Sequence, residues 1–450
     1  MTIERHADTA ARRCGPIRRT GDTMSTSASA TAGNNDTLLP MLIVGALFFI
    51  FGFVTWLNGP LIQFVELAFT LNTVNAFLVL MVFYLSYFFL ALPSAWILKR
   101  TGMKKGMATG LFTMAVGALA FGEFALRRWY PGALCGLFVI GAGLSLLQTA
   151  SNPYISILGP IETAARRIAF MGICNKAAGI LAPLVLGALV MHGLGDLKAR
   201  VAGADAATRE ALLGEFAARI HMPYLAMAVL LAVLAVAILK SPLPELRPSQ
   251  ANREEAAHPQ HGDSIFSFPH LWLGVLCLFL YVGVEVMAGD AIGTYGKGFG
   301  LPDDQTKLFT SFTLASMLAG YVAGLVLIPR VVSQERYLAF SAMLGVVLAI
   351  AAYCTHDYVS VGCVAALGFA NAMMWPAIFP LAIARLGRHT ETGSALLIMG
   401  IAGGAIIPQI FAHLREQHDF QLVFAAIMVP CYLYILFYAL RGCRAGLSHA

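Results

Sequence analysis

Charged side chains are scarce in this chain of 450 residues: aspartate, glutamate, lysine and arginine together make up 12% of it. Soluble domains carry about 25%. Hydrophobic residues, in contrast, reach 58%, and the mean hydropathy is +0.73. This composition excludes an ordinary soluble protein and predicts a protein that lies within a membrane.

Paired cysteines and a cleavable leader are also missing. The eight cysteines are scattered and form no C-x-x-C pair, which argues against a disulfide framework or a metal site. No apolar stretch precedes residue 38, so the polar segment 1–37 is predicted to be a disordered cytoplasmic tail rather than a signal peptide. Met24 is an alternative start. The chain also lacks the basic cluster with interleaved aromatic residues that is typical of nucleic-acid binding.

Long apolar runs recur along the whole chain. Each is long enough to cross about 30 Å of hydrocarbon as a helix. We therefore predict an all-α membrane protein with 12 transmembrane helices in two six-helix halves. The predicted spans are 38–58, 74–98, 106–126, 132–157, 167–192, 222–240, 270–292, 307–329, 337–355, 359–384, 392–412 and 420–440.

The basic residues indicate the orientation. When the loops are assigned alternately to the two sides, most of the 30 lysines and arginines fall on the side that both termini share. Cytoplasmic loops carry such an excess. We expect a multi-pass protein of a bacterial-type inner membrane with both termini in the cytoplasm.

The chain divides into two similar parts. Segment 241–269 is polar and predicted to be a cytoplasmic linker between the six-helix halves 38–240 and 270–440; a cytoplasmic tail, 441–450, follows. The string AAGILAP at 177–183 matches AGGAIIP at 402–408. Duplicated halves with interrupted helices predict a cavity near the middle of the bilayer and transport by alternating access.

The fourth span contains QTASNPY, residues 148–154, within an otherwise apolar run. Each buried polar group without a partner costs about 2–7 kcal/mol, so we place Gln148 and Asn152 at a water-filled cavity. The alternative is a hydrogen bond between helices, which contributes about 0.6 kcal/mol. Neutral amides offer donors and acceptors to a sugar. The candidate substrate-binding residues are Asn58, Gln148, Asn152, Asn175, Asn371, Trp375 and Gln409.

Ionisable residues within a membrane span indicate function by default. Glu285 is the first candidate for ion coupling and Asp290 the second. Lys176 in the fifth span requires an acid, a carbonyl group or water beside it. Glu285 is its candidate partner, and the sequence leaves that pairing open.

Three strings carry a family resemblance: FFIFGFVTWLNGPLI at 48–62, FYLSYFFLALPSAWILKRTGMKKG at 83–106, and GAGLSLLQTASNPYISILGPIETAARRI at 141–168. Together they resemble the major facilitator superfamily, and within it the fucose/galactose permease family of sugar:cation symporters. The loop at 99–105 is similar to the gating loop of the superfamily, with Arg100, Gly102 and Lys104 in place. Lys99 stands where the superfamily usually has an acid.

Two positions depart from the proton-coupled fucose permease of that family. It has an acid in the first span and another in the fourth, where this chain has Gly59 and Gln148. Gln148 resembles the glucose/galactose branch, where an amide at this place implies a sugar site without proton exchange. Coupling must then use other groups.

These observations predict cation-coupled uptake, with Na+ or H+, of a neutral monosaccharide, which we expect to be glucose or galactose. N-acetylglucosamine or L-fucose as substrate, or a polyspecific exporter of the same fold, are the alternatives. We expect a monomer without a cofactor. An intramembrane enzyme is disfavoured because the spans contain no nucleophile with its base and no H-E-x-x-H metal motif.

Overall fold

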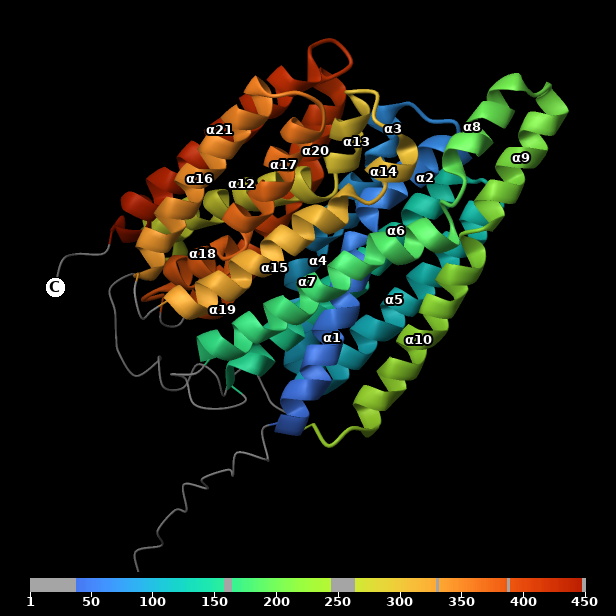
Figure 1. The fold of residues 1–450 in the computed structure, drawn as a ribbon. Helices are drawn as coiled ribbons and strands as arrows, with labels where there is room; N and C mark the ends of the chain where they lie inside the picture. Colours follow the sequence, from blue (N-terminus) through green and yellow to red (C-terminus); the bar gives the residue numbers. More distant parts are fainter. Residues whose placement is uncertain (1–37, 158–163, 244–263, 329–331, 387–388, 447–450) are drawn as a thin grey trace, which may run out of the picture.

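The computed structural model describes residues 38–157, 164–243, 264–328, 332–386 and 389–446, and every regular element in these ranges is a helix (Figure 1). Within them, 12 helical stretches are long and apolar enough to cross a membrane. The predicted all-α fold with 12 spans is therefore confirmed. The predicted tail 1–37, most of the predicted linker and the last residues of the predicted C-terminal tail lie outside the described residues.

The predicted spans agree with the helices to within a few residues, except that the first continues to Ala68. The first six spans are α1 (Leu38–Trp56) with α2 (Asn58–Ala68), α3 (Thr73–Ala76) with α4 (Leu78–Thr101), α5 (Met103–Leu126), α6 (Tyr130–Ile157), α7 (Ala164–Leu189) and α10 (His221–Lys240). The last six are α12 (Pro269–Gly289) with α13 (Ile292–Lys297), α14 (Asp303–Thr306) with α15 (Phe309–Leu327), α16 (Gln334–Cys354), α17 (Asp357–Asn371) with α18 (Met374–Ile383), α19 (Thr390–Met399) with η5 (Gly400–Ala402) and α20 (Gly403–Leu414), and α21 (Phe420–Leu440). Besides η5, two further short 3-10 helices are η3 (Ile265–Ser267) and η6 (Gly442–Arg444).

The connection between the fifth and sixth spans is itself helical. It forms α8 (Leu194–Gly203) and α9 (Ala206–Ala218), which project beyond the bundle (Figure 1). Leu212 and Phe216 lie one turn apart on α9 and are both buried. The Phe216 ring packs 5.1 Å from that of Phe64 in α2. This single apolar stripe is too narrow to predict a span, and the surrounding charges indicate a loop.

Prolines interrupt the first and tenth spans at defined places. The ring of a proline clashes with the carbonyl group four residues earlier and the residue donates no hydrogen bond. Pro60 follows Trp56, the last residue of α1, by four positions, and Pro376 follows Ala372, which separates α17 from α18, by the same number. A proline alone does not determine an interruption, because Pro93 and Pro183 lie within the continuous helices α4 and α7.

The repeated strings make matching contacts. In the first string, a Cβ atom on Gly179 would lie 2.5 Å from Trp56 Cδ1, so α7 packs directly on the first span. In the second, a Cβ atom on Gly404 would lie 3.0 Å from Val286 Cγ2, so α20 packs on the seventh span. The glycine of each string thus permits the same close approach between equivalent helices.

Ion pairs join the first six spans to the last six on the side of the bundle opposite to the termini. Lys297 Nζ at the end of α13 lies 3.0 Å from Glu66 Oε2 in α2. Lys198 Nζ in α8 lies 2.5 Å from Asp303 Oδ2 in α14. These contacts hold the two sets of spans together on this side, which we call the closed side.

Candidate functional site

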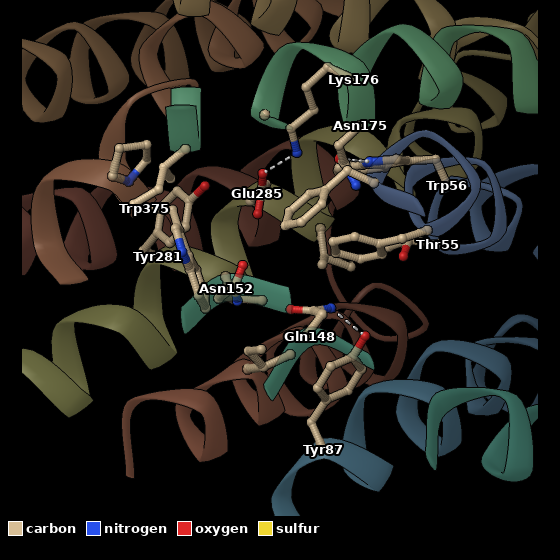
Figure 2. Close-up of a pocket in the computed structure, with 18 of the residues that line it drawn as sticks. Thr55, Trp56, Tyr87, Gln148, Asn152, Asn175, Lys176, Tyr281, Glu285 and Trp375 are labelled. Atoms are coloured by element: carbon tan, nitrogen blue, oxygen red, sulfur yellow. Dashed lines mark hydrogen bonds and ion pairs between the residues drawn. The ribbon is translucent and has the colours of Figure 1, made fainter. Parts of the chain in front are cut away.

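A cavity of about 130 Å³ lies between the two sets of six spans. Its lining residues come from α1, α4, α6 and α7 on one side and from α12, α15, α18 and η5 on the other (Figure 2). The cavity therefore lies where the duplication of the sequence predicts a site.

One ion pair crosses the cavity. Lys176 Nζ in α7 lies 2.9 Å from Glu285 Oε1 in α12, and their side chains are 8% and 12% exposed (Figure 2). The ammonium group also lies 4.4 Å from the centre of the Trp56 ring, an arrangement typical of a cation–π interaction. The structure thus forms the pair that the sequence left open, and the two side chains together carry no net charge.

Close packing of α1 on α7 directs Asn175 and Lys176 into the cavity. A Cβ atom on Gly52 would lie 2.1 Å from the Asn175 backbone oxygen, so only glycine fits at this crossing. One turn further along α1, Trp56 Nε1 donates a hydrogen bond to Asn175 Oδ1 at 3.4 Å. The close contact between α1 and α7 therefore holds the side chains of Asn175 and Lys176 in the cavity.

The amides of the fourth span form the opposite wall (Figure 2). Gln148 and Asn152 are four residues apart and thus lie on one face of α6. Gln148 Nε2 donates to Tyr87 Oη at 2.8 Å. Both amides line the cavity, as the sequence predicts for this polar cluster in an apolar helix.

Aromatic rings complete the lining. Trp375 stacks on Phe379, with ring centres 5.9 Å apart and planes 20° apart. Tyr281 lies beside Trp375 at the same end of the cavity, away from Trp56 (Figure 2). Such rings present apolar faces together with polar edges, so the cavity combines hydrogen-bonding and stacking surfaces.

Asp290 lies behind this lining rather than in it. The residue is 1% exposed, and its Oδ2 accepts a hydrogen bond from Tyr84 Oη at 3.2 Å. Tyr84 itself lines the cavity. On its other side the carboxylate packs against Gly59, which lies just after the break between α1 and α2. A Cβ atom on Gly59 would lie 3.1 Å from Asp290 Oδ1 and 2.6 Å from Thr310 Oγ1.

Comparison with known proteins identifies the family. The family model of the Major Facilitator Superfamily matches residues 44–408. The chain belongs to the major facilitator superfamily. Its members are transporters, so the expectation of a transporter rather than an enzyme is confirmed, as is the predicted family of sugar:cation symporters.

Relatives within the superfamily align along most of the chain. A protein named glucose/galactose transporter from Brucella abortus is 33% identical over 405 residues, which is 89% of this chain and 93% of the relative. A putative glucose/galactose transporter from Helicobacter pylori is 29% identical and covers 88% of this chain and 95% of its own length. The L-fucose-proton symporter of Escherichia coli is 25% identical and covers 84% of this chain and 87% of its own length.

Solved structures agree with the fold. The transporter FucP in its outward conformation has a TM-score of 0.70 at 24% identity, with 92% of this chain and 100% of that chain covered. The xylose transporter XylE of E. coli in an inward open conformation has a TM-score of 0.64 at 13% identity, with 88% and 95% covered. These likenesses support the superfamily fold.

Three predicted substrate-binding residues do not line this cavity, and each makes a hydrogen bond elsewhere in the bundle. Asn58 Nδ2 donates to the Thr55 backbone oxygen at 3.0 Å. Asn371 Oδ1 accepts from Tyr432 Oη at 2.8 Å. Gln409 Nε2 donates at 3.2 Å to the backbone oxygen of Val74, across the two sets of spans. The other four, Gln148, Asn152, Asn175 and Trp375, line the cavity together.

The predicted gating loop connects the second and third spans of the superfamily fold. Gly102 separates α4 from α5 with φ of 81°, a left-handed value that favours glycine. The guanidinium group of Arg100 lies 3.8 Å from the centre of the Trp96 ring. Lys104 Nζ donates to the Ser241 backbone oxygen at 2.7 Å, which ties the loop to the end of the sixth span. The gating role itself stays a prediction.

Sequence reasoning missed the tyrosines of the cavity. Tyr84, Tyr87, Tyr281 and Tyr321 all line it. Tyr84 and Tyr87 lie three residues apart on α4 and stack with ring centres 6.5 Å apart. Tyrosine hydroxyl groups at membrane depth require polar partners, so their occurrence inside apolar spans is the signal that could have found them.

Proposed function

We propose that this transporter imports a neutral monosaccharide, glucose or galactose, together with Na+ or H+ by alternating access. The observation that carries the proposal is the cavity wall of Gln148 and Asn152 facing aromatic rings, in a chain that is 33% identical to a glucose/galactose transporter. Neutral amides bond hydroxyl groups without requiring a charged substrate.

In this proposal the lining residues Gln148, Asn152, Asn175 and Trp375 contact the sugar. Lys176, Glu285 and Asp290 are the candidates for ion coupling, because they are the ionisable groups at the cavity and directly behind it. The Lys176–Glu285 pair belongs to both sets of spans, so a change in its distance accompanies their relative movement.

We also propose that both termini are cytoplasmic, that the membrane is the bacterial-type inner membrane and that the protein works as a monomer. The excess of lysine and arginine in the loops on the terminal side supports this orientation. The closed side, with its Lys297–Glu66 pair, then faces outward. In this proposal the state with a shut closed side is inward-facing.

The test is uptake of radiolabelled sugars into proteoliposomes with imposed Na+ or H+ gradients. The sugars are glucose, galactose, N-acetylglucosamine and L-fucose, and the variants are Gln148→Ala and Gln421→Ala. Gln421 is the matched control because it is as buried as Gln148, at 7% exposure, and bonds backbone oxygens outside the cavity, among them that of Ala352 at 2.9 Å.

Accumulation of glucose or galactose against a gradient, strongly reduced in Gln148→Ala and retained in Gln421→Ala, is the expected result. Preference for N-acetylglucosamine or L-fucose would keep the fold and replace the substrate; a relationship to an L-fucose-proton symporter makes the second of these the main rival. Movement of none of the four sugars would contradict the proposal and favour a polyspecific exporter.

A further inference from the structure

We propose that Asp290 is the site at which a proton is taken up and released during sugar transport, and that the Lys176–Glu285 pair is not. This inference rests on the proposed function and names the coupling ion and its residue. It follows from the charge balance, the packing and the position of Asp290 between the two sets of spans.

The carboxylate of Asp290 lacks a compensating charge. It is 1% exposed within the seventh span, and no ion pair joins it to a lysine or arginine among the residues that the structure describes. Tyr84 Oη donates to Oδ2, and the backbone N–H of Gly59 also acts on the carboxylate, but neither donor carries a positive charge. A buried charge without a partner costs several kcal/mol. A proton on Asp290 removes that cost.

Glu285 is in the opposite situation. Its Oε1 lies 2.9 Å from Lys176 Nζ, so the pair is already neutral. A proton on Glu285 would leave the buried ammonium group of Lys176 without its counter-charge, which is unfavourable. Protonation therefore neutralises the site at Asp290 and creates an unpaired charge at Glu285.

The packing around Asp290 favours a proton over a metal cation. Gly59 lies so close that a Cβ atom there would meet Thr310 Oγ1 at 2.6 Å and Asp290 Oδ1 at 3.1 Å. Thr310 Oγ1 already donates to the Gly289 backbone oxygen at 2.8 Å. Hard metal cations require several oxygen ligands at once, and the neighbouring hydroxyl group of Thr310 is already engaged. A proton needs no additional space.

Asp290 is placed to respond to both the sugar and the movement of the spans. It belongs to the last six spans, whereas Tyr84 and Gly59 belong to the first six. Tyr84 lines the cavity and stacks on Tyr87, which in turn accepts from Gln148 Nε2 at 2.8 Å. A sugar that displaces Gln148 or Tyr84 thus changes the hydrogen bond to Asp290.

The proton step is a simple acid–base reaction. When the two sets of spans separate on the closed side, an O–H bond forms at the Asp290 carboxylate with a proton from outside water. After reorientation the same bond breaks and the proton leaves to the other side. The titratable groups that act on Asp290 are Tyr84 from α4, Lys176 from α7 and Glu285 from its own helix; Gly59 and Thr310, on the remaining elements, carry no ionisable group.

The test compares Asp290→Asn with Glu285→Gln, two acid-to-amide changes in the same span. In proteoliposomes with an inward proton gradient, Asp290→Asn should retain sugar counterflow while its inside-to-outside sugar ratio falls to unity. The transport that remains in Glu285→Gln should still follow the proton gradient. Accumulation by Asp290→Asn at the wild-type ratio, or wild-type accumulation that requires Na+ and ignores the proton gradient, would overturn the inference.

Infrared spectroscopy of the purified protein tests protonation without any sugar. Wild-type protein should show the C=O band of a protonated, buried carboxylic acid that Asp290→Asn lacks and Glu285→Gln keeps. Tyr84→Phe should shift this band because Oδ2 loses its donor, and it serves as the second variant if Asp290→Asn does not fold. The band without movement of any sugar would refute the proposed function alone; its absence at every pH would refute the proton site.

Discussion

Mutating both members of the Lys176–Glu285 pair should lower the free energy of unfolding by less than the sum of the decreases caused by the two single mutations. The single variants are Lys176→Met and Glu285→Gln, and the double variant combines them. Each single change leaves one charge in a place where the side chains are only 8% and 12% exposed. The double variant leaves no unpaired charge.

The magnitude follows from that burial. Removing one partner of a buried pair costs about 3–5 kcal/mol, and we expect about 3 kcal/mol because both side chains touch the cavity. The double variant loses chiefly the contact of Lys176 with Trp56, worth about 1 kcal/mol. With about 3 kcal/mol lost in each single variant and about 1 kcal/mol in the double variant, the coupling free energy between the two residues should be about 5 kcal/mol.

The assay is equilibrium unfolding of the purified protein in mixed detergent micelles, analysed as a double-mutant cycle. The control is the exposed pair of Arg127 and Glu123, whose side chains are 71% and 49% exposed and 3.7 Å apart. Its coupling should be about 0.3–0.5 kcal/mol. If the free energies of the two cavity variants simply add, the pair makes no contribution of its own and the reasoning from burial is wrong.

Three further predictions concern packing, the closed side and the aromatic wall. Gly403→Ala should fail to accumulate in the membrane, because its Cβ atom would lie 1.8 Å from the Phe279 backbone oxygen, whereas Gly362→Ala, with nothing within 4 Å, should express normally in a fluorescent-fusion assay. Lys297→Gln removes contacts to acids on both sets of spans, so labelling of an engineered cysteine in the cavity from outside should become several-fold faster; an unchanged rate would contradict the assignment of the closed side. Trp375→Ala should raise the KM for sugar several-fold without changing the amount of folded protein, and an unchanged KM would exclude stacking as a source of affinity.

The spans could be predicted because an apolar run long enough to cross the bilayer has few other stable structures available to it. The interruptions at Trp56 and Ala372 were not predictable from proline alone, since each precedes a proline by four residues but the prolines within α4 and α7 leave those helices continuous. The helices α8 and α9 were not predictable either, because their apolar stripe is narrow and their charges are typical of a loop.

The candidate site could be predicted where the type of residue alone indicates a cavity, as with a polar amide inside an apolar membrane span. Gln148 and Asn152 are rare in apolar helices, and both line the cavity. Asn371 and Gln409 look the same in the sequence but bond other helices. Only the rotation of each helix about its axis separates these cases, and it depends on contacts between distant segments. The Lys176–Glu285 pair lay beyond the sequence for the same reason.

The ion pairs of the closed side make the transporter sensitive to the salt concentration around the cell. Glu66 and Lys198 are partly exposed, at 29% and 38%, so dissolved salt reaches the contacts that they make with the last six spans. The range of electrostatic attraction falls from about 30 Å at 0.01 M salt to about 8 Å at 0.15 M. With the closed side facing outward, as proposed, dilute surroundings favour its closure and saline surroundings ease its opening. The affinity of this transporter for an external sugar should consequently depend on ionic strength, even for a substrate that carries no charge.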